Sequence, residues 1–356
     1  MKAGHRVTVL TTSRHDAVEK EEKNGFTIRF LSPSTPMKLS KSWFKESLSV
    51  VRELHAEAPI DVIHSNEFAA KGIIRWARKN AIPMAVVCHG SLRTELLSFL
   101  SAADMRPRYW HLLLLTPMHL IRRCILWEIP MRKASRSIIL VSPTLKRDFS
   151  AYSKGKVRVI ENGITLPDPP KRRASSDKLR LLCTGRADKQ KGFQTAIRAV
   201  SKMEDVPLHL DIVGTGPYFE DLKAISTHLN VDDRVTFHGR VEDDELSRIY
   251  SSADVYLIPT TRYEGLPLAL VEAMSHGIPT ISSDIGGNSD VITHGSDGLF
   301  IKPGDLSELI EAIHRLESDP VERHAISEAA RATAERRFDK HRMISETLEV
   351  LESIAG

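Results

Sequence analysis

The chain has 356 residues, of which 41% are hydrophobic and 27% are charged. This length and composition predict a globular protein of roughly two domains, at about 100–200 residues per domain, and argue against disorder and low complexity. The net charge of +4 is too small to indicate a nucleic-acid-binding protein.

Short β-rich segments alternate with longer helical patterns along the first half of the chain, which is typical of parallel sheets with crossover helices. Most of these segments are continuous apolar runs, as expected for strands covered on both faces. The expected strands are 6–11, 27–31, 61–65, 84–88, 137–141 and 157–160, and the expected helices are 43–57, 67–79, 105–134 and 143–152.

The alternation stops at 162–177, where Pro, Gly and charged residues predict an exposed linker. We expect an N-terminal domain at 1–161, a second α/β domain at 178–338, and a helix at 339–356 that packs back on the first domain. Two doubly wound domains joined by one linker predict a ligand-binding cleft at the carboxyl ends of both sheets. The expected strands of the second domain are 179–184, 208–213, 235–237, 255–258, 280–282 and 299–301, and its expected helices are 193–203, 218–229, 243–251, 266–275, 305–317 and 321–338.

The sequence predicts neither a membrane span nor a disulfide framework. Its longest uncharged apolar run, 109–121, has 13 residues, against roughly 20 for a transmembrane helix. The chain enters its first strand almost at once, which leaves no room for a secretory signal. The three cysteines, Cys88, Cys124 and Cys183, lie far apart, so we expect a reducing, cytoplasmic setting without a zinc site.

A turn with two glycines and two cations follows the expected strand 179–184: Gly185, Arg186, Lys191 and Gly192. Glycine permits close approach to the backbone, and the N-terminus of the following helix adds partial positive charge. The turn therefore suits a phosphate or diphosphate. Taken alone, a solvated loop with ordinary surface cations is the alternative.

Two glutamates, Glu264 and Glu272, lie eight positions apart after the expected strand 255–258. On one helix they would be about 80° apart around the axis and roughly 12 Å apart along it, too far for a general acid/base pair. Each can instead accept hydroxyl hydrogen bonds from a different part of one elongated ligand. A helix dipole stabilised by Glu264 is the alternative, but it leaves Glu272 unexplained among Leu270, Val271, Ala273 and Met274.

These residues resemble a known family in combination. Gly185-Arg186 with Lys191-Gly192, and Glu264-x7-Glu272 followed by Ala-Met-x-x-Gly-x-Pro, are similar to motifs of the retaining glycosyltransferases of family 4, which have the GT-B fold and use nucleotide-sugar donors. Gly214-x-Gly216, Cys88-His89-Gly90 and Gly4-His5-Arg6-Val7 also fit. The resemblance covers almost the whole chain and implies two doubly wound Rossmann-like domains of α/β class that face each other across a cleft.

The resemblance implies the following donor contacts. Arg186 and Lys191 would grip the diphosphate and neutralise the leaving phosphate, next to Gly185. Glu272 would bind the ribose hydroxyls. Glu264, with backbone N–H groups from Gly265, Leu266 and Leu268, would hold the sugar and the diphosphate.

On the same resemblance, Gly214 and Gly216 would wall the nucleotide pocket, and the backbone near Arg240 would meet the base. His89, at the carboxyl end of the expected strand 84–88, would reach the donor sugar from the other domain. A structural histidine is the alternative for His89 alone.

The family normally opens with a strand, a Gly-Gly loop and a helix ahead of its Gly-His-x-Val motif, which begins here at Gly4. We therefore expect weak sugar transfer from the 356 residues and restored transfer when roughly 20–30 upstream residues are added, a length estimated from one strand, a turn and a helix.

Charge is uneven along the chain, because residues 101–175 hold 15 Lys and Arg against 5 Asp and Glu. Within them, bulky apolar residues of 105–136 are interleaved with Arg106, Arg108, Arg122 and Arg123. We interpret this stretch as a helical insertion on the acceptor side, suited to an anionic membrane surface or a lipid-linked acceptor. The alternative is a core helix with a solvated basic edge.

The expected function is retaining transfer of a sugar from a UDP- or GDP-linked donor to a hydroxyl of a lipid-linked or glycan acceptor. We expect no cofactor and no metal, since no Asp-x-Asp occurs, and no nucleic-acid partner. The expected location is cytoplasmic, with peripheral contact at the inner face of the membrane. A non-catalytic nucleotide-binding paralogue and a nucleotide-sugar epimerase on the same fold are the alternatives.

Overall fold

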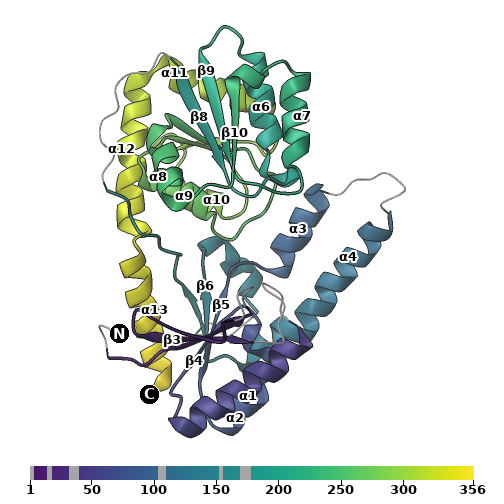
Figure 1. Cartoon of the computed structure of the whole chain (residues 1–356), viewed down its shortest axis with the longest axis vertical. Coiled ribbons are helices and arrows are strands. Elements are labelled where there is room, and N and C mark those ends of the chain that lie inside the picture. Colours follow the sequence, from purple (N-terminus) through teal and green to yellow (C-terminus); the bar gives the residue numbers. More distant parts are fainter. Residues whose placement is uncertain (1–3, 14–17, 32–39, 103–109, 152–154, 169–177) are drawn as a thin grey trace.

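The computed structural model describes residues 4–13, 18–31, 40–102, 110–151, 155–168 and 178–356. They form two lobes, each built on parallel strands with helices on both faces (Figure 1). We call the part with strands β1 to β7 the N-terminal lobe and the part with strands β8 to β13 the C-terminal lobe. The arrangement confirms the predicted α/β class.

The described strands of the N-terminal lobe form two sheets. Strand order in the first is β1-β3-β2 and in the second β4-β5-β6-β7. Among the described strands, the two sheets are therefore not joined by hydrogen bonds between β1 and β4. Antiparallel β2 was not predicted, because its Lys-Glu-Glu-Lys sequence carries no apolar signal. The strands are β1 (Thr8–Thr12), β2 (Lys20–Lys23), β3 (Phe26–Leu31), β4 (Ile63–Asn66), β5 (Met84–Cys88), β6 (Ser137–Leu140) and β7 (Val157–Val159).

The predicted helix 105–134 is confirmed over its described part and carries one irregularity. Its helical residues run without a break from Trp110 to Ala134, as α4, a π-helical turn η3 and α5. Near the start of α5 lies Pro130, which lacks the N–H that a regular helix would use. Helix α3 before it was not predicted, and Arg106 and Arg108 lie outside the described residues. The helical elements are α1 (Lys41–Glu57), η1 (Ala69–Ile73), α2 (Ile74–Lys79), α3 (Leu92–Ala102), α4 (Trp110–Arg123), η3 (Cys124–Glu128), α5 (Ile129–Ala134) and η4 (Pro143–Phe149).

The C-terminal lobe follows the sequence prediction closely. Its sheet is entirely parallel, in the order β10-β9-β8-β11-β12-β13. The strands are β8 (Leu179–Thr184), β9 (Leu208–Val213), β10 (Val235–Gly239), β11 (Val255–Ile258), β12 (Thr280–Ser283) and β13 (Leu299–Ile301). The helical elements are η5 (Lys189–Lys191), α6 (Phe193–Lys202), α7 (Phe219–His228), η6 (Asp232–Arg234), α8 (Asp243–Ser252), α9 (Leu268–Ser275), α10 (Asn288–Val291) and α11 (Leu306–Ser318).

Two long helices, α12 (Pro320–Arg337) and α13 (Lys340–Ala355), run from the C-terminal lobe down to the N-terminal lobe (Figure 1). Where they meet, Asp339 forms a β-bridge with Ile164. Near the other end of α13, Glu352 accepts a 2.9 Å hydrogen bond from His5. The last helix therefore contacts the N-terminal lobe. None of the helices in the described ranges is long and apolar enough to cross a membrane.

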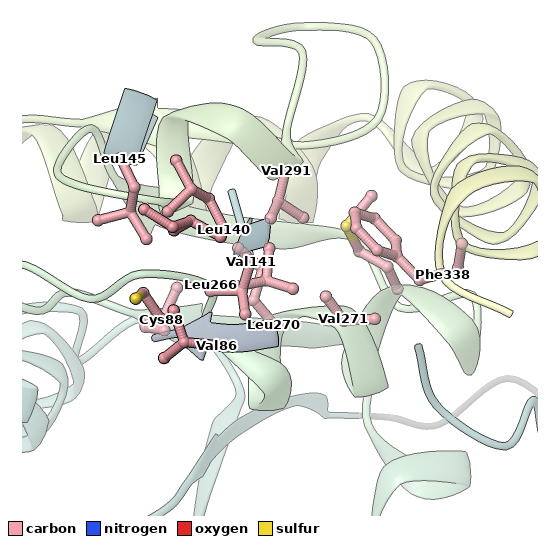
Figure 2. Close-up of a cluster of buried hydrophobic side chains, with 14 of the residues drawn as sticks. Val86, Cys88, Leu140, Val141, Leu145, Leu266, Leu270, Val271, Val291 and Phe338 are labelled. Carbon is pink, nitrogen blue, oxygen red and sulfur yellow. The ribbon is translucent and has the colours of Figure 1, made fainter. Parts of the chain in front are cut away.

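One apolar cluster joins the lobes. Figure 2 shows side chains of β5, β6 and the segment after β6 against side chains of α9 and its flanks, with Phe338 at one end. Burial of apolar surface across such a contact holds the lobes together. The labelled members are Val86, Cys88, Leu140, Val141, Leu145, Leu266, Leu270, Val271, Val291 and Phe338.

Candidate active site

The loop after β8 lies against the loop after β9. A Cβ on Gly214 would lie 1.9 Å from the carbonyl oxygen of Gly185, and the φ of Gly214 is +123°, so only glycine fits there. Gly216 approaches Ala187 in the same way, at 2.3 Å for a Cβ. The two predicted glycine pairs are thus parts of one surface at the carboxyl ends of β8 and β9.

The two predicted cations of this surface differ in environment. Arg186 is exposed. Lys191 is 16% exposed, and its Nζ lies 2.5 Å from Oε1 of Glu264, which is 19% exposed. A half-buried ion pair of this kind can exchange partners when an anionic ligand arrives.

Glu264 is not on a helix with Glu272, which corrects the predicted geometry. Helix α9 begins at Leu268, after Pro267 in an extended conformation. Proline restricts the residue before it to extended backbone, so the segment from Glu264 forms a turn, and the carbonyl of Glu264 accepts the N–H of Gly287 at 2.8 Å. Leu266 is buried and Leu268 is exposed.

Glu272 is held by a tyrosine that the sequence analysis missed. The hydroxyl of Tyr250 donates to Oε2 of Glu272 at 3.0 Å. Behind it, Thr184 Oγ1 lies 2.8 Å from the Tyr250 hydroxyl and 3.0 Å from the Tyr256 hydroxyl. Burial raises the pKa of Glu272 and the bond from Tyr250 opposes it. The bond from Tyr250 therefore positions one carboxylate oxygen of Glu272.

His89 belongs to the N-terminal lobe, whereas these groups belong to the C-terminal lobe. It follows β5 directly and its side chain is exposed, while partial desolvation lowers the pKa of its imidazole. Its carbonyl oxygen would be 1.9 Å from a Cβ on Gly265. The turn carrying His89 and the loop carrying Glu264 therefore touch through Gly265.

Arg240 lies beside the surface formed by the loops after β8 and β9, on the side of β10. It is exposed and follows β10, whose last carbonyl, that of Gly239, accepts the N–H of Gly214 at 2.7 Å. The predicted base-binding segment is thus next to the glycine loop. Among the residues within the described ranges, no group of three His, Cys, Asp or Glu side chains could hold a metal ion.

Comparison with known proteins identifies the family. Residues 1–166 match the family Glycosyltransferase Family 4, and residues 167–333 match the family Glycosyl transferases group 1. The chain belongs to the family 4 glycosyltransferases. The predicted family resemblance is confirmed.

Two curated relatives illustrate how similar the chain is to known proteins. The chain is 26% identical over 353 residues to a sulfoquinovosyl transferase of Arabidopsis thaliana, with 94% of the chain and 64% of the relative covered. It is 34% identical over 223 residues to a lipopolysaccharide core biosynthesis glycosyltransferase of Rhizobium meliloti, with 61% of the chain and 64% of the relative covered. The matches span less than two thirds of each relative's length.

Solved structures confirm the predicted GT-B fold. A sucrose-phosphate synthase from Thermosynechococcus elongatus superposes with a TM-score of 0.80 at 19% identity, covering 99% of this chain and 90% of that one. HepE of Anabaena in complex with UDP and glucose superposes with a TM-score of 0.71 at 19% identity, covering 92% of this chain and 86% of that one.

Helix α3 of this glycosyltransferase fold contacts the loops after β8 and β11, which the sequence analysis did not anticipate. Ser98 Oγ accepts the N–H of Tyr263 at 2.9 Å, and Ser101 Oγ donates to the carbonyl of Thr261 at 2.9 Å. Gln190, next to Lys191, donates to the carbonyl of Ser98 at 2.5 Å. Isolated serines on a helix carry no sequence signal for such contacts, because the partners are about 90 and 165 positions away.

Proposed function

We propose that the chain transfers a sugar from a nucleotide-sugar donor to a hydroxyl acceptor with retention at the anomeric carbon. The observation that carries the proposal is the junction of the two lobes, where the Lys191–Glu264 ion pair lies near the turn of His89. Cations, a carboxylate and an imidazole at the carboxyl ends of two sheets suit a ligand with a diphosphate and a sugar.

The proposed roles follow the chemistry of each group. Arg186 and Lys191 would stabilise the negative charge on the leaving diphosphate. Once Lys191 binds the diphosphate, the carboxylate of Glu264 would be released to accept hydrogen bonds from the sugar hydroxyls. In the transfer, the bond from the anomeric carbon to the phosphate oxygen breaks with its electron pair, and the acceptor oxygen bonds to that carbon from the same face. The acceptor proton passes to the leaving phosphate. Glu272 would accept hydroxyl hydrogen bonds from the ribose.

The test measures nucleotide binding, donor hydrolysis and transfer separately. Thermal shift with UDP and GDP reports which nucleotide binds. Release of nucleotide from UDP-glucose and GDP-mannose is then followed with and without glycan or lipid-linked acceptors. Release that increases with acceptor supports transfer. Binding without release supports a non-catalytic paralogue, and a change of the free sugar nucleotide without an acceptor supports an epimerase.

We further propose that the acceptor side of the N-terminal lobe lies against an anionic membrane or lipid headgroup. Along α4 and η3, four large apolar side chains are exposed by 43–65%: Met118, Ile121, Ile125 and Leu126. Arg122 beside them and Lys133 and Arg136 after them are exposed cations. Apolar side chains flanked by cations favour the interface of an anionic membrane.

Two other cations of this segment form ion pairs within the protein. Arg123, one of the residues predicted to face the acceptor, pairs with Glu95 and with Glu128, the latter at 3.0 Å. Arg132 is 5% exposed and pairs with Glu128 at 2.9 Å. Arg132 therefore belongs to the interior of the lobe, where a buried pair is costly to break, and Arg123, whose side chain is 22% exposed, is held at its edge by two carboxylates.

Replacing Arg122, Lys133 and Arg136 together with Gln should weaken binding to phosphatidylserine vesicles by about 1 kcal/mol per residue near the surface. Binding to phosphatidylcholine vesicles should barely change. Three exposed cations of the C-terminal lobe, Arg198, Lys202 and Arg248, are the matched control. Equal sedimentation of the two triple variants and the wild type with anionic vesicles would contradict the membrane proposal.

A further inference from the structure

Glu67 has an unusual backbone conformation at the end of a strand of the N-terminal lobe. It follows β4 directly, and its φ is +49°, in the left-handed region that residues other than glycine rarely adopt. Such conformations persist where the surrounding structure enforces them, and they are concentrated at functional sites.

The carboxyl group of Glu67 is tied to the turn of His89. Its Oε1 accepts the backbone N–H of His89 at 2.7 Å, so the ends of β4 and β5 are joined at the carboxyl edge of their sheet. The carbonyl of His89 borders Gly265 of the other lobe. Glu67 is therefore one residue away from the contact between the lobes, and its side chain is half-buried.

Glu67 belongs to a cluster with more carboxylates than cations. Arg123 pairs with Glu95 and Glu128, and Arg132 pairs with Glu128, whereas no ion pair with Glu67 occurs among the residues that the structure describes. Desolvation raises the pKa of Glu67 to about 7, with smaller contributions from its charged neighbours. Within the described part of the chain, the Glu67 carboxylate has one hydrogen-bond partner, the N–H of His89 at Oε1.

We propose that Glu67 is part of the acceptor half of the reaction site, where its Oε2 accepts a hydrogen bond from the attacking hydroxyl of an acceptor or of water. An ionised carboxylate only accepts hydrogen bonds, and a half-buried one needs donors at both oxygens. The bond of Oε1 to His89 would let one residue place both the hydroxyl and the His89 turn. This inference rests on the proposed sugar transfer.

Glu67→Gln separates this role from a structural one. The amide oxygen can still accept the N–H of His89, but the NH₂ group that replaces Oε2 is a donor and cannot accept a hydrogen bond from a hydroxyl. We expect affinity for UDP and GDP within about twofold of the wild type and at least a tenfold slower hydrolysis of UDP-glucose or GDP-mannose, since bonds to charged groups are worth about 1.5–3 kcal/mol. Glu95→Gln removes the same charge from the same cluster and should keep the hydrolysis rate within about twofold.

The pH profile gives an independent measurement. Because the ionised carboxylate is the better acceptor, wild-type hydrolysis should rise between about pH 6 and pH 8, around the pKa of about 7. Glu67→Gln should lose this rise. Burial lowers the pKa of His89, so its titration is displaced toward acid pH, away from the pKa of Glu67. The charged and titratable groups around Glu67 are Cys88 and His89 at the end of β5, Glu95 on α3, Arg123 on α4, Glu128 in η3 and Arg132 on α5.

The outcomes are distinguishable. Hydrolysis by Glu67→Gln at the wild-type rate, or an equal loss in Glu95→Gln, overturns the role of Glu67 and leaves the proposed transfer intact. A wild type that binds neither nucleotide and hydrolyses neither donor overturns both. If Glu67→Gln does not unfold cooperatively, Glu67→Asp is used, which keeps the charge. It should retain the rise with pH at a lower rate, and a flat profile in Glu67→Asp would overturn the inference.

Discussion

Lys191→Ala should lower the rate of sugar transfer by about 100–1000-fold, which is typical when one preorganised group that stabilises developing charge is removed. Donor affinity should fall less, since a charge-assisted hydrogen bond is worth roughly 1.5–3 kcal/mol in the ground state. Part of the loss has a second cause. Without Lys191, the half-buried carboxylate of Glu264 at 2.5 Å loses its partner and would repel the diphosphate.

A double-mutant cycle with Glu264→Gln isolates this second cause. If repulsion by an unpaired Glu264 contributes, Lys191→Ala with Glu264→Gln should bind nucleotide more tightly than Lys191→Ala alone. Lys189→Ala is the matched control, because Lys189 is on the same turn η5 and is exposed. Arg186→Ala should behave as Lys191→Ala does, without the gain in the double variant. Near-normal kinetics in both Arg186→Ala and Lys191→Ala would contradict the proposal that these two residues bind the diphosphate.

The sequence predicted the sheets of the C-terminal lobe because their strands are buried on both faces and read as continuous apolar runs. Strand β11, all of whose residues are buried, is an example. The polar strand β2 and the helix α3 were not predicted, because neither has the continuous apolar run of the buried strands. β2 is a charged hairpin strand paired only with β3 among the described strands, and α3 is defined by its packing against distant loops rather than by its own pattern.

The candidate site was predictable where a motif is local and not where a contact is distant. The Gly185 turn carries its glycines, its cations and its helix start within eight residues, so its chemistry is visible in the sequence. The partner of Glu272 is Tyr250, 22 positions away, and no pattern connects them. The Glu128–Arg132 pair has helical i,i+4 spacing and was open to prediction, whereas Glu95 is 28 positions from Arg123 and only the fold brings these two together.

Gly265 forms a close contact between the lobes, and Gly265→Ala tests whether that contact sets the reaction geometry. A Cβ there would lie 1.9 Å from the carbonyl oxygen of His89 and 3.3 Å from Cγ2 of Val141. The nearer atom belongs to backbone and cannot rotate away, so the added methyl must move the His89 turn or part the lobes. Overpacking of this kind typically costs 1–3 kcal/mol of stability.

The effect of Gly265→Ala on transfer should exceed its effect on stability. A displacement of about 1 Å between reacting groups can cost about 100-fold in rate, and this substitution displaces the turn carrying His89 relative to Glu264. Nucleotide affinity should stay near that of the wild type, because the loops of Gly185 and Gly214 lie within the C-terminal lobe. Gly155→Ala is the control, since a Cβ there meets nothing within 4 Å. Transfer by Gly265→Ala at the wild-type rate, measured alongside thermal unfolding, would show that the reaction does not depend on this contact.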